Sequence, residues 1–488
     1  MLSQSTNQLS QPTNQARSEL DLGLSRIHHV LKHLGNPEQS FSTIHVAGTN
    51  GKGSVCAILE SCLRVSSAFH HIGRFVSPYL IEPRDAVWID GKPIDKVKWE
   101  VILEKVLSSS LLLLTNNCID KPLTTFELWT IAAFMCFQAA SVDIAVIEVG
   151  VGGRDDATNV IPTPLVAVIT SISMDHVELL GPSIADIATH KSGIIKAPLS
   201  TSNKPSIVVV SPYQNEIVLQ VIHKQAKMKN AKVIQAQSLL HVKNDANLYD
   251  SIEVRDDNFQ FKVPLALLGS FQLANGGTAL ATLRVIQTYF PRFTDEEIIN
   301  GFSKVVWPGR FQKIIVSPPS SMSSSSSLPL DFILDGGHNE GALPLVRKSI
   351  DDLLVSLPQT KNNRFVQFIF SSGASRSLES LLPHLLKPGD SIFAIPFTTP
   401  EGMGWVKSHT PETIVTVVNK LFHDSNPPVE AVAFATLDEA LTTVFERESL
   451  SRYNTDNIDE AKIPALRVIC GSLYLVSDVY RREQLLGT

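Results

Sequence analysis

The sequence has few cysteines, and those it has are scattered. Only five of the 488 residues are cysteine, and no two of them form a Cys-x-x-Cys pair. An odd, dispersed set of this kind argues against a disulfide framework and against a zinc site. We therefore expect reduced, mostly buried thiols in a reducing compartment.

Long apolar runs and long basic runs are also missing. The longest apolar stretches, at residues 111–114 and 131–140, are shorter than the roughly 20 residues that a membrane-spanning helix needs. The formal net charge is −6, and no basic run offers a surface for nucleic acid. We expect neither a membrane nor a nucleic acid as a partner.

The first 18 residues lack the apolar segment of a signal peptide. They are rich in Ser, Gln, Asn and Thr, and Arg17 is their single basic residue. This composition predicts a disordered tail at residues 1–18. We expect a cytoplasmic protein, and a mitochondrial location is the less favoured alternative.

The chain does contain a regular alternation of apolar runs and helical patterns. Apolar runs at 44–47, 144–149, 165–172 and 207–210 alternate with helical patterns at 55–68, 95–114, 126–140 and 184–190. Such alternation predicts an α/β domain with a mainly parallel sheet and helices on both faces. Short alternating segments at 232–264 predict antiparallel hairpins, and residues 271–290 return to a helix.

A length of 488 residues predicts more than one domain. We place the boundary after residue 307, so that the first domain spans 19–307 and the second spans 308–488. In the second domain, apolar runs at 332–334, 365–370, 391–395 and 467–470 predict a smaller, doubly wound α/β domain. The serine-rich run 317–329 cannot pack a core, and it predicts a loop between two strands of this domain.

Residues 44–54 form an apolar strand, a glycine-rich turn and the start of a helix. Gly48, Gly51 and Gly53 allow backbone N–H groups to surround an anion. Lys52 brings a positive charge to terminal phosphates, and the Ser54 hydroxyl is a Mg²⁺ ligand type at a helix N-terminus. The spacing departs from the general P-loop because Gly53 separates the lysine from the serine. An ordinary glycine-rich turn is the alternative.

Two further segments place acidic residues at element ends. Glu148 closes an apolar strand and is followed by glycines, which predicts a Mg²⁺ ligand at the carboxyl edge of the parallel sheet. An unpaired carboxylate in an apolar strand would be costly without such a role. In Thr124-Thr-Phe-Glu127 the spacing also fits a helix capping box, which is a sufficient structural explanation for that segment.

The order Gly-Thr-Asn-Gly-Lys-Gly-Ser at residues 48–54 resembles the ATP loop of the Mur-ligase superfamily and, within it, of the folate ligases. The match is to the dihydrofolate synthases in particular, which belong to the folylpolyglutamate synthase family. Further segments resemble that family in the same order along the chain, at 21–27, 73–80, 124–127, 148–159, 170–176, 190–196, 269–275, 308–312 and 335–339. The sequence departs from the family at Tyr79, where histidine is commoner, and at Asp155, where leucine is usual.

The resemblance implies a set of site residues. ATP contacts are implied at Asn50, Gly51, Lys52, Gly53, Ser54, Asn275, Arg310 and Asp335. Metal ligands are implied at Ser54, Ser77, Glu148, His176 and Lys191, with Lys191 carbamylated and two Mg²⁺ bound. Contacts to the pterin substrate are implied at Leu22, Gly23, Leu24, Thr124, Thr125, Phe126, Glu127, Asp155, Asp156 and Ala157. Catalytic roles fall to Lys52, Glu148, His176, Lys191 and Arg310.

The resemblance also implies a fold and a reaction. The fold is a P-loop ATPase domain with a mainly parallel sheet, followed by the smaller doubly wound domain. The reaction is ATP-dependent joining of L-glutamate to 7,8-dihydropteroate through an acyl phosphate, by an enzyme that we expect to be a monomer.

Alternative functions stay open. One is a folylpolyglutamate synthase that extends a folate tail, or a bifunctional enzyme that does both. Asn50 disfavours a folylpolyglutamate synthase, because eukaryotic polyglutamate synthases tend to carry lysine at the position of Asn50. Another is a nucleotide-binding module without ligase activity, which the presence of Lys52, Glu148 and His176 disfavours.

Overall fold

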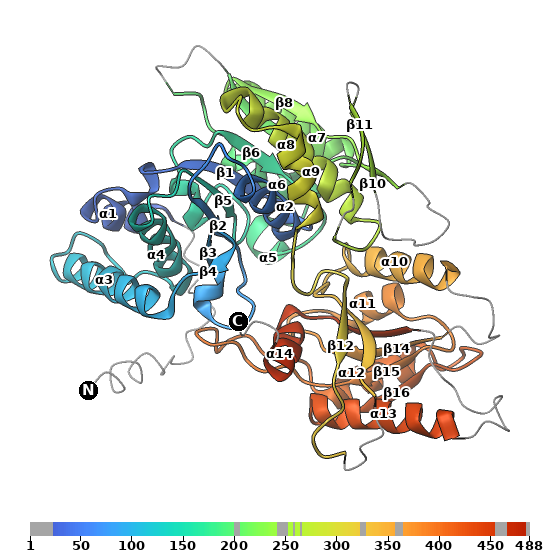
Figure 1. Cartoon of the computed structure of the whole chain (residues 1–488). Coiled ribbons are helices and arrows are strands. Elements are labelled where there is room, and N and C mark those ends of the chain that lie inside the picture. The colour runs from blue at the N-terminus through green and yellow to red at the C-terminus, as the bar shows by residue number, and fades with distance from the viewer. Residues whose placement is uncertain are drawn as a thin grey trace.

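Two open, mainly parallel sheets and a small antiparallel sheet form the framework of this computed structural model (Figure 1). The structure describes residues 23–199, 205–241, 252–256, 259–263, 266–322, 328–356, 365–453 and 466–484. The predicted tail at 1–18 and Leu22 lie outside these residues. The mixed α/β class is confirmed. In the described part of the chain, no helix has the length and apolar character needed to cross a membrane.

The large sheet has eight strands in the order β4-β3-β2-β5-β1-β6-β7-β8. From β2 to β8 every neighbouring pair is parallel, whereas β3 and β4 are added antiparallel at one edge. The strands are β1 Ser42–Ala47, β2 Ile72–Phe75, β3 Val87–Ile89, β4 Lys92–Pro93, β5 Ile144–Glu148, β6 Val166–Ile169, β7 Ser206–Val210 and β8 Ala231–Gln235.

Helices cover both faces of the large sheet. They are α1 Ser25–His33, α2 Lys52–Arg64, α3 Lys96–Thr115, α4 Thr125–Ala139, α5 Val177–Leu180, α6 Ile184–Lys191, α7 Glu216–Met228, α8 Gln272–Tyr289 and α9 Asp295–Ser303. Side chains of α2, α8 and α9 share one core with the strands. On the opposite face, α1, α3 and α4 cover one half of the sheet, and α5, α6 and α7 cover the other half.

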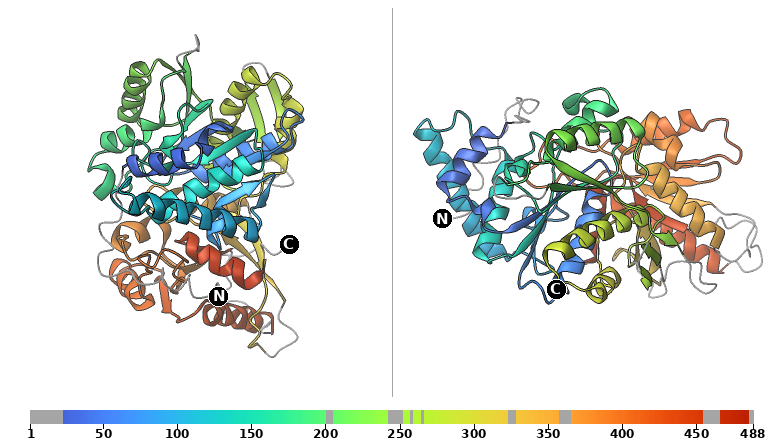
Figure 2. Two further views of the ribbon diagram at one scale, coloured as in Figure 1. Left: turned by 90° about the vertical axis from the view of Figure 1, so that its left-hand side faces the viewer. Right: turned by 90° about the horizontal axis from the view of Figure 1, so that it is seen from above.

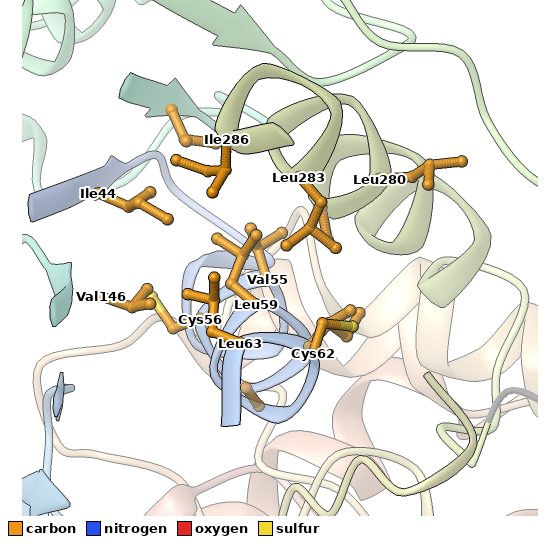
Figure 3. Close-up of a cluster of buried hydrophobic side chains, with 14 of the residues drawn as sticks. Ile44, Val55, Cys56, Leu59, Cys62, Leu63, Val146, Leu280, Leu283 and Ile286 are labelled. Carbon is orange, nitrogen blue, oxygen red and sulfur yellow. The ribbon is translucent and has the colours of Figure 1, made fainter. Parts of the chain in front are cut away.

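The core beneath α2 fixes the start of that helix at the end of β1. Val55, Leu59 and Leu63 recur at the spacing of one helix face, and they pack against side chains of α8 and of the strands (Figure 3). Ile44 of β1 points into this cluster, whereas Ala47 lies in the cluster on the other face. Because α2 is anchored over the sheet, its N-terminus is held at the carboxyl edge of the strands.

One sequence prediction about the strands is wrong. Residues 232–264 were predicted to form hairpins, but the first of them belong to β8, Ala231–Gln235, which pairs in parallel with β7. This strand lies at the sheet edge and is only half-buried, so its alternating pattern resembles that of an antiparallel strand. The hairpin prediction holds farther on, where β9 Leu240–His241, β10 Ile252–Asp256 and β11 Phe259–Val263 form an antiparallel sheet.

The second sheet has six strands in the order β12-β13-β17-β14-β15-β16, with only β12 antiparallel to its neighbour. The strands are β12 Gln312–Val316, β13 Leu330–Leu334, β14 Val366–Phe370, β15 Ser391–Ala394, β16 Glu430–Ala433 and β17 Leu466–Cys470. One face is covered by α10 Leu343–Ser356, α11 Leu378–Leu385 and α12 Pro411–Leu421. The other face is covered by α13 Leu437–Tyr453 and α14 Leu473–Glu483.

The change from one sheet to the other falls between α9 and β12. In the left view of Figure 2 the orange and red part lies below the blue and green part. The serine-rich segment 317–329 connects β12 to β13, although residues 323–327 are outside the described part. The boundary after residue 307 stays a prediction.

Candidate functional site

A pocket lies where the carboxyl ends of β1, β5 and β6 meet the segment that follows β13. Polar residues from both sheets line it. The sequence-predicted residues that line it are Asn50, Gly51, Lys52, Gly53, Ser54, Glu148, His176, Lys191, Asn275, Arg310 and Asp335. Segments far apart in the sequence therefore converge on one cavity at the edge where doubly wound sheets bind ligands.

The phosphate loop needs glycine at Gly51. Gly51 precedes α2 with φ +89, and a Cβ there would lie 2.2 Å from Oδ1 of Asn275. The helix begins at Lys52, so unpaired backbone N–H groups and the positive helix end face the pocket. Asn275 donates to Gln272, and Gln272 donates to the Ser54 hydroxyl. This chain of contacts holds Asn275 of α8 against the loop.

Glu148 is a buried carboxylate beside Lys52. Its side chain lies 3.7 Å from Nζ of Lys52 and accepts a hydrogen bond from the Ser77 backbone N–H at 3.3 Å. Burial raises the pKa of Glu148, while Lys52 and Arg310 act in the opposite direction. A carboxylate that is 4% exposed with so few partners is suited to neutralising a bound cation.

His176 follows β6 in a left-handed conformation, with φ +50. Desolvation lowers the pKa of His176 to about 4, although 38% of the side chain is exposed; Asp175 opposes that change, and nearby cations including Arg376 add to it. The imidazole is therefore neutral at pH 7 and keeps a lone pair for a metal. Burial alone would raise the pKa of Asp175, but His176 and Arg376 hold it below its usual range.

Lys191 ends α6 beneath the phosphate loop. Its side chain is buried, and Nζ donates to the carbonyl of Gly48 at 2.7 Å. Burial, followed by the charge of Lys52, lowers the pKa of Lys191 to about 7. A substantial fraction of this amine is therefore neutral and nucleophilic near neutral pH.

Among the described residues, no group of three or more His, Cys, Asp or Glu side chains is placed to hold a metal ion. The ligand set expected from the sequence also draws on serine hydroxyls and on Lys191. Mg²⁺ commonly takes only one or two carboxylates from the protein and completes its shell with water and substrate phosphates. The donors at this edge, with Glu148 as the buried carboxylate, are consistent with this mode of Mg²⁺ coordination.

Arg310 and Asp335 reach the pocket from the second sheet. The carboxylate of Asp335 is buried and accepts from the backbone N–H groups of Phe311 at 2.8 Å and Gly337 at 2.7 Å. Burial raises the pKa of Asp335, and the charge of Arg310 opposes this. A Cβ at Gly336 would lie 2.4 Å from Nη1 of Arg310, so the missing side chain leaves room for the guanidinium.

Of the residues predicted to contact the pterin, some lie beside the pocket and others have structural partners. Phe126 and Asp156 flank Gly150 of the pocket, since a Cβ there would lie 2.5 Å from the Phe126 ring and 3.1 Å from Oδ2 of Asp156. Asp156 is buried and also accepts from the N–H groups of Val151 and Thr158. These contacts brace the turn after β5.

Other predicted pterin residues have structural partners. Thr124 and Glu127 form the expected capping box at the start of α4. Glu127 also pairs with the buried Arg26 at 3.2 Å, so its carboxylate joins α1 to α4. Asp155 is partly exposed and pairs with Arg154. Gly23 and Leu24 precede α1, Thr125 opens α4, and Ala157 opens the turn after Asp156.

Sequence reasoning missed several residues near the pocket. They are Thr49, Ser173, Asp175, Asn339 and Arg376, which are joined by hydrogen bonds or an ion pair to one another or to Asn50. Arg376 follows the apolar strand β14 in a short polar stretch. The rule that ligands gather at carboxyl ends of strands, applied to the second sheet, would have indicated it.

The comparisons with known proteins agree with this arrangement. Residues 46–283 match the Mur ligase middle domain, and residues 320–482 match the dihydrofolate synthetase C-terminal domain. The chain is 31% identical to the probable dihydrofolate synthetase of Schizosaccharomyces pombe, covering 96% of this chain and 99% of the relative. It is 32% identical to the dihydrofolate synthetase of Saccharomyces cerevisiae, covering 95% and 98%.

A solved structure shares the whole fold. The Mycobacterium tuberculosis folylpolyglutamate synthase, crystallised with ADP and AMPPCP, superposes with a TM-score of 0.77 at 25% identity, covering 100% of this chain and 98% of that one. The full-length relatives, both domain matches and the shared fold lead to one conclusion. The chain belongs to the dihydrofolate synthetase and folylpolyglutamate synthase family of ATP-dependent Mur-type ligases.

Proposed function

We propose that this chain uses ATP to join L-glutamate to 7,8-dihydropteroate, with dihydrofolate, ADP and phosphate as the products. The observation that carries the proposal is the pocket that combines Lys52 and Glu148, at the edge of the large sheet, with Arg310 and Asp335, which flank strands of the second sheet. The relatives that align along nearly the whole chain are dihydrofolate synthetases, which supports this choice of acceptor.

The pocket suits activation of a carboxylate by phosphoryl transfer. A carboxylate oxygen of dihydropteroate attacks the γ-phosphorus of ATP, ADP leaves, and an acyl phosphate forms. The neutral amine of glutamate then attacks the acyl carbon, phosphate leaves, and the nitrogen releases one proton to solvent as the amide bond forms. The N-terminus of α2 and Lys52 bind the phosphates from one side, and Arg310 neutralises the transferred group from the other.

Mg²⁺ is the metal that these donors fit. We assign Ser54, Ser77 and Glu148 to a first ion and His176 with Lys191 to a second. Bound Mg²⁺ would supply charge neutralisation for the phosphates. Lys191 takes part as a carbamate in this proposal, because a neutral buried amine next to the loop can react with CO₂.

The carbamate leads to a pH-dependent prediction. Enzyme stripped of CO₂ should regain activity about tenfold faster at pH 8 than at pH 6 when the concentration of dissolved CO₂ is the same. The reason is that an amine with a pKa of about 7 is mostly neutral at pH 8 and mostly protonated at pH 6. Product formation over time after CO₂ addition measures this recovery. Lys196→Arg is the matched control, because the Lys196 amine donates to the Asn159 carbonyl. Equal rates of recovery at pH 6 and pH 8 in the native protein would contradict the carbamate assignment.

A second prediction concerns the space around Arg310. Gly336→Ala should lower kcat by about 10- to 100-fold while the protein stays folded, since the new methyl group displaces the guanidinium and a misplaced catalytic group is costly. The atom nearest to the added Cβ is the far end of a long side chain, and the next is Cδ1 of Leu473 at 3.1 Å, so we expect the variant to fold. Steady-state kinetics measure the effect. Gly404→Ala is the control because nothing lies within 4 Å of its Cβ position, and a kcat within twofold of native for Gly336→Ala would contradict the role of Arg310.

For the pterin, Phe126 and Asp156 are the residues that lie at the pocket edge. We propose that these two residues line the pteroate site. Glu127 would hold α4, which carries Phe126, in place through its ion pair with Arg26. Leu22, Gly23, Leu24, Thr124, Thr125, Asp155 and Ala157 are retained as proposed contacts around it. A monomeric state and a cytoplasmic location likewise stay proposals.

The alternative function is extension of a folate tail, alone or together with the first reaction. Bifunctional relatives such as the Bacillus subtilis dihydrofolate synthase/folylpolyglutamate synthase motivate it, although that alignment covers only 74% of this chain. The test is to incubate the protein with ATP, Mg²⁺ and glutamate, offering dihydropteroate in one sample and a reduced folate monoglutamate in the other. ADP and product mass are then measured. Product only from dihydropteroate supports the proposal, product only from the folate overturns it, and product from both makes the enzyme bifunctional.

A further inference from the structure

Side chains that follow strands of the two sheets are connected by hydrogen bonds beside the pocket. We call Asn50, Ser173, Asp175, Asn339 and Arg376 the inter-sheet clamp. Asn50 donates to Asn339 at 3.3 Å, and Asn339 donates back to Asn50 at 3.1 Å. Asn50 also donates to the Ser173 hydroxyl at 3.4 Å. The two amides thus pair a residue of the phosphate loop with one that follows β13.

Asp175 is the centre of the inter-sheet clamp. Oδ2 of Asp175 accepts from Asn339 at 3.1 Å, and Oδ1 accepts from the guanidinium of Arg376 at 2.6 Å. Both donors belong to the second sheet region, whereas Asp175 follows β6 of the first. The Asp175 side chain is 5% exposed and that of Arg376 is 26% exposed. Removing Arg376 would leave the buried Asp175 carboxylate without its charged partner, and loss of one member of a buried ion pair is costly.

At Gly341, close to Asn339 in the sequence, the backbone lies so near residues of the first sheet region that a side chain would not fit. A Cβ at Gly341 would lie 2.6 Å from the Ser173 hydroxyl and 2.9 Å from Nδ2 of Asn50. The hydrogen bonds therefore form at a place where the two halves of the molecule are in van der Waals contact. Asn50 directly precedes Gly51 and Lys52, so the position of this contact is transmitted to the phosphate loop.

We propose that Arg376 is a positioning residue that, through Asp175 and Asn339, locks the second sheet region against the phosphate loop. In this role Arg376 touches neither ATP nor the acceptor. It keeps the halves closed so that Arg310 and Asp335 stand opposite Lys52 and Glu148. The kinetic consequences rest on the proposed function, whereas the closure itself does not.

The test compares Arg376→Gln, Arg376→Lys and a control in the native, full-length protein. The control is Arg447→Gln, which removes an arginine that pairs with Glu430 within the second sheet region, away from the pocket. Steady-state kinetics give kcat and the KM for each substrate. Calorimetry gives the Kd of a non-hydrolysable ATP analogue, and small-angle X-ray scattering with the analogue bound gives the radius of gyration.

The proposal predicts that Arg376→Gln lowers kcat about tenfold or more, since misplacing a catalytic group costs that much. The Kd for the analogue should stay within about threefold of native, and the radius of gyration should increase. Arg376→Lys keeps the charge and should recover part of both effects, and Arg447→Gln should resemble the native protein. Partial rescue by lysine also guards against a variant that simply folds poorly.

Two results would overturn the proposal. One is a rise in the KM for glutamate with kcat retained, which would make Arg376 a substrate contact. The other is an unchanged radius of gyration and an unchanged kcat in Arg376→Gln. If the native protein forms no dihydrofolate, the proposed function fails, and the scattering measurement still decides whether Arg376 holds the two halves closed.

Discussion

Lys52→Ala is expected to abolish ligation, with a fall in kcat of about 10³-fold or more, and to leave the fold intact. Lys52 lines the pocket at the start of α2, and its ammonium lies 3.7 Å from Glu148. In the proposed reaction, removing it takes away a preorganised positive charge at the transferred phosphoryl group, where such charges have their largest effect. It also leaves the buried Glu148 without its nearest cation, so the pKa of that carboxyl rises further.

The measurement is the rate of ADP and dihydrofolate formation, accompanied by circular dichroism and thermal unfolding of the variant. Lys98→Ala, at an exposed position on α3, is the control for loss of a lysine as such. Near-normal turnover in Lys52→Ala would refute the assignment of residues 48–54 as the ATP loop.

Glu148→Gln should reduce the rate by about 10²-fold or more and shift the Mg²⁺ titration to higher concentrations. Glutamine keeps the size of the side chain and its ability to accept from Ser77, but it removes the negative charge that we propose to bind the cation. The shape of the core is therefore preserved while the metal site is weakened.

The readout is kcat as a function of free Mg²⁺ at saturating ATP. Glu430→Gln serves as the control, because that glutamate pairs with Arg447 far from the pocket. A Glu148→Gln variant whose half-saturating Mg²⁺ concentration equals that of the native protein would show that Glu148 is no metal ligand.

That residues 48–54 and Glu148 meet at one pocket could be predicted from the sequence because the signals are local. Residues 48–54 follow one apolar strand and Glu148 ends the neighbouring one, and adjacent parallel strands bring their carboxyl ends to the same edge. The capping box of Thr124 and Glu127 is local as well, and the structure contains it.

What escaped prediction depends on partners that are distant in the sequence. The Asp175–Arg376 pair spans 201 positions, and the Arg26–Glu127 pair spans 101. No spacing rule connects such residues before the fold is known. The two members of each pair come together only when the chain has folded.

Strand β2 was missed for a different reason. It has four residues, and Gly73-Arg74 interrupts its apolar pattern. Arg74 is nevertheless buried, because Glu60 pairs with it and its guanidinium lies 4.3 Å from the ring centre of Trp88. A buried arginine with these partners looks like a polar loop residue when only the sequence is available.

The most direct test of the account uses 7,8-dihydropteroate labelled with ¹⁸O in its carboxylate. If that carboxylate attacks the γ-phosphorus, one labelled oxygen leaves with phosphate when glutamate attacks the acyl carbon. Mass spectrometry of the products after a single turnover should therefore find one ¹⁸O in phosphate and one in the new amide of dihydrofolate. Phosphate without label, or ATP hydrolysis without dihydrofolate, would contradict the acyl-phosphate route and with it the proposed ligase reaction.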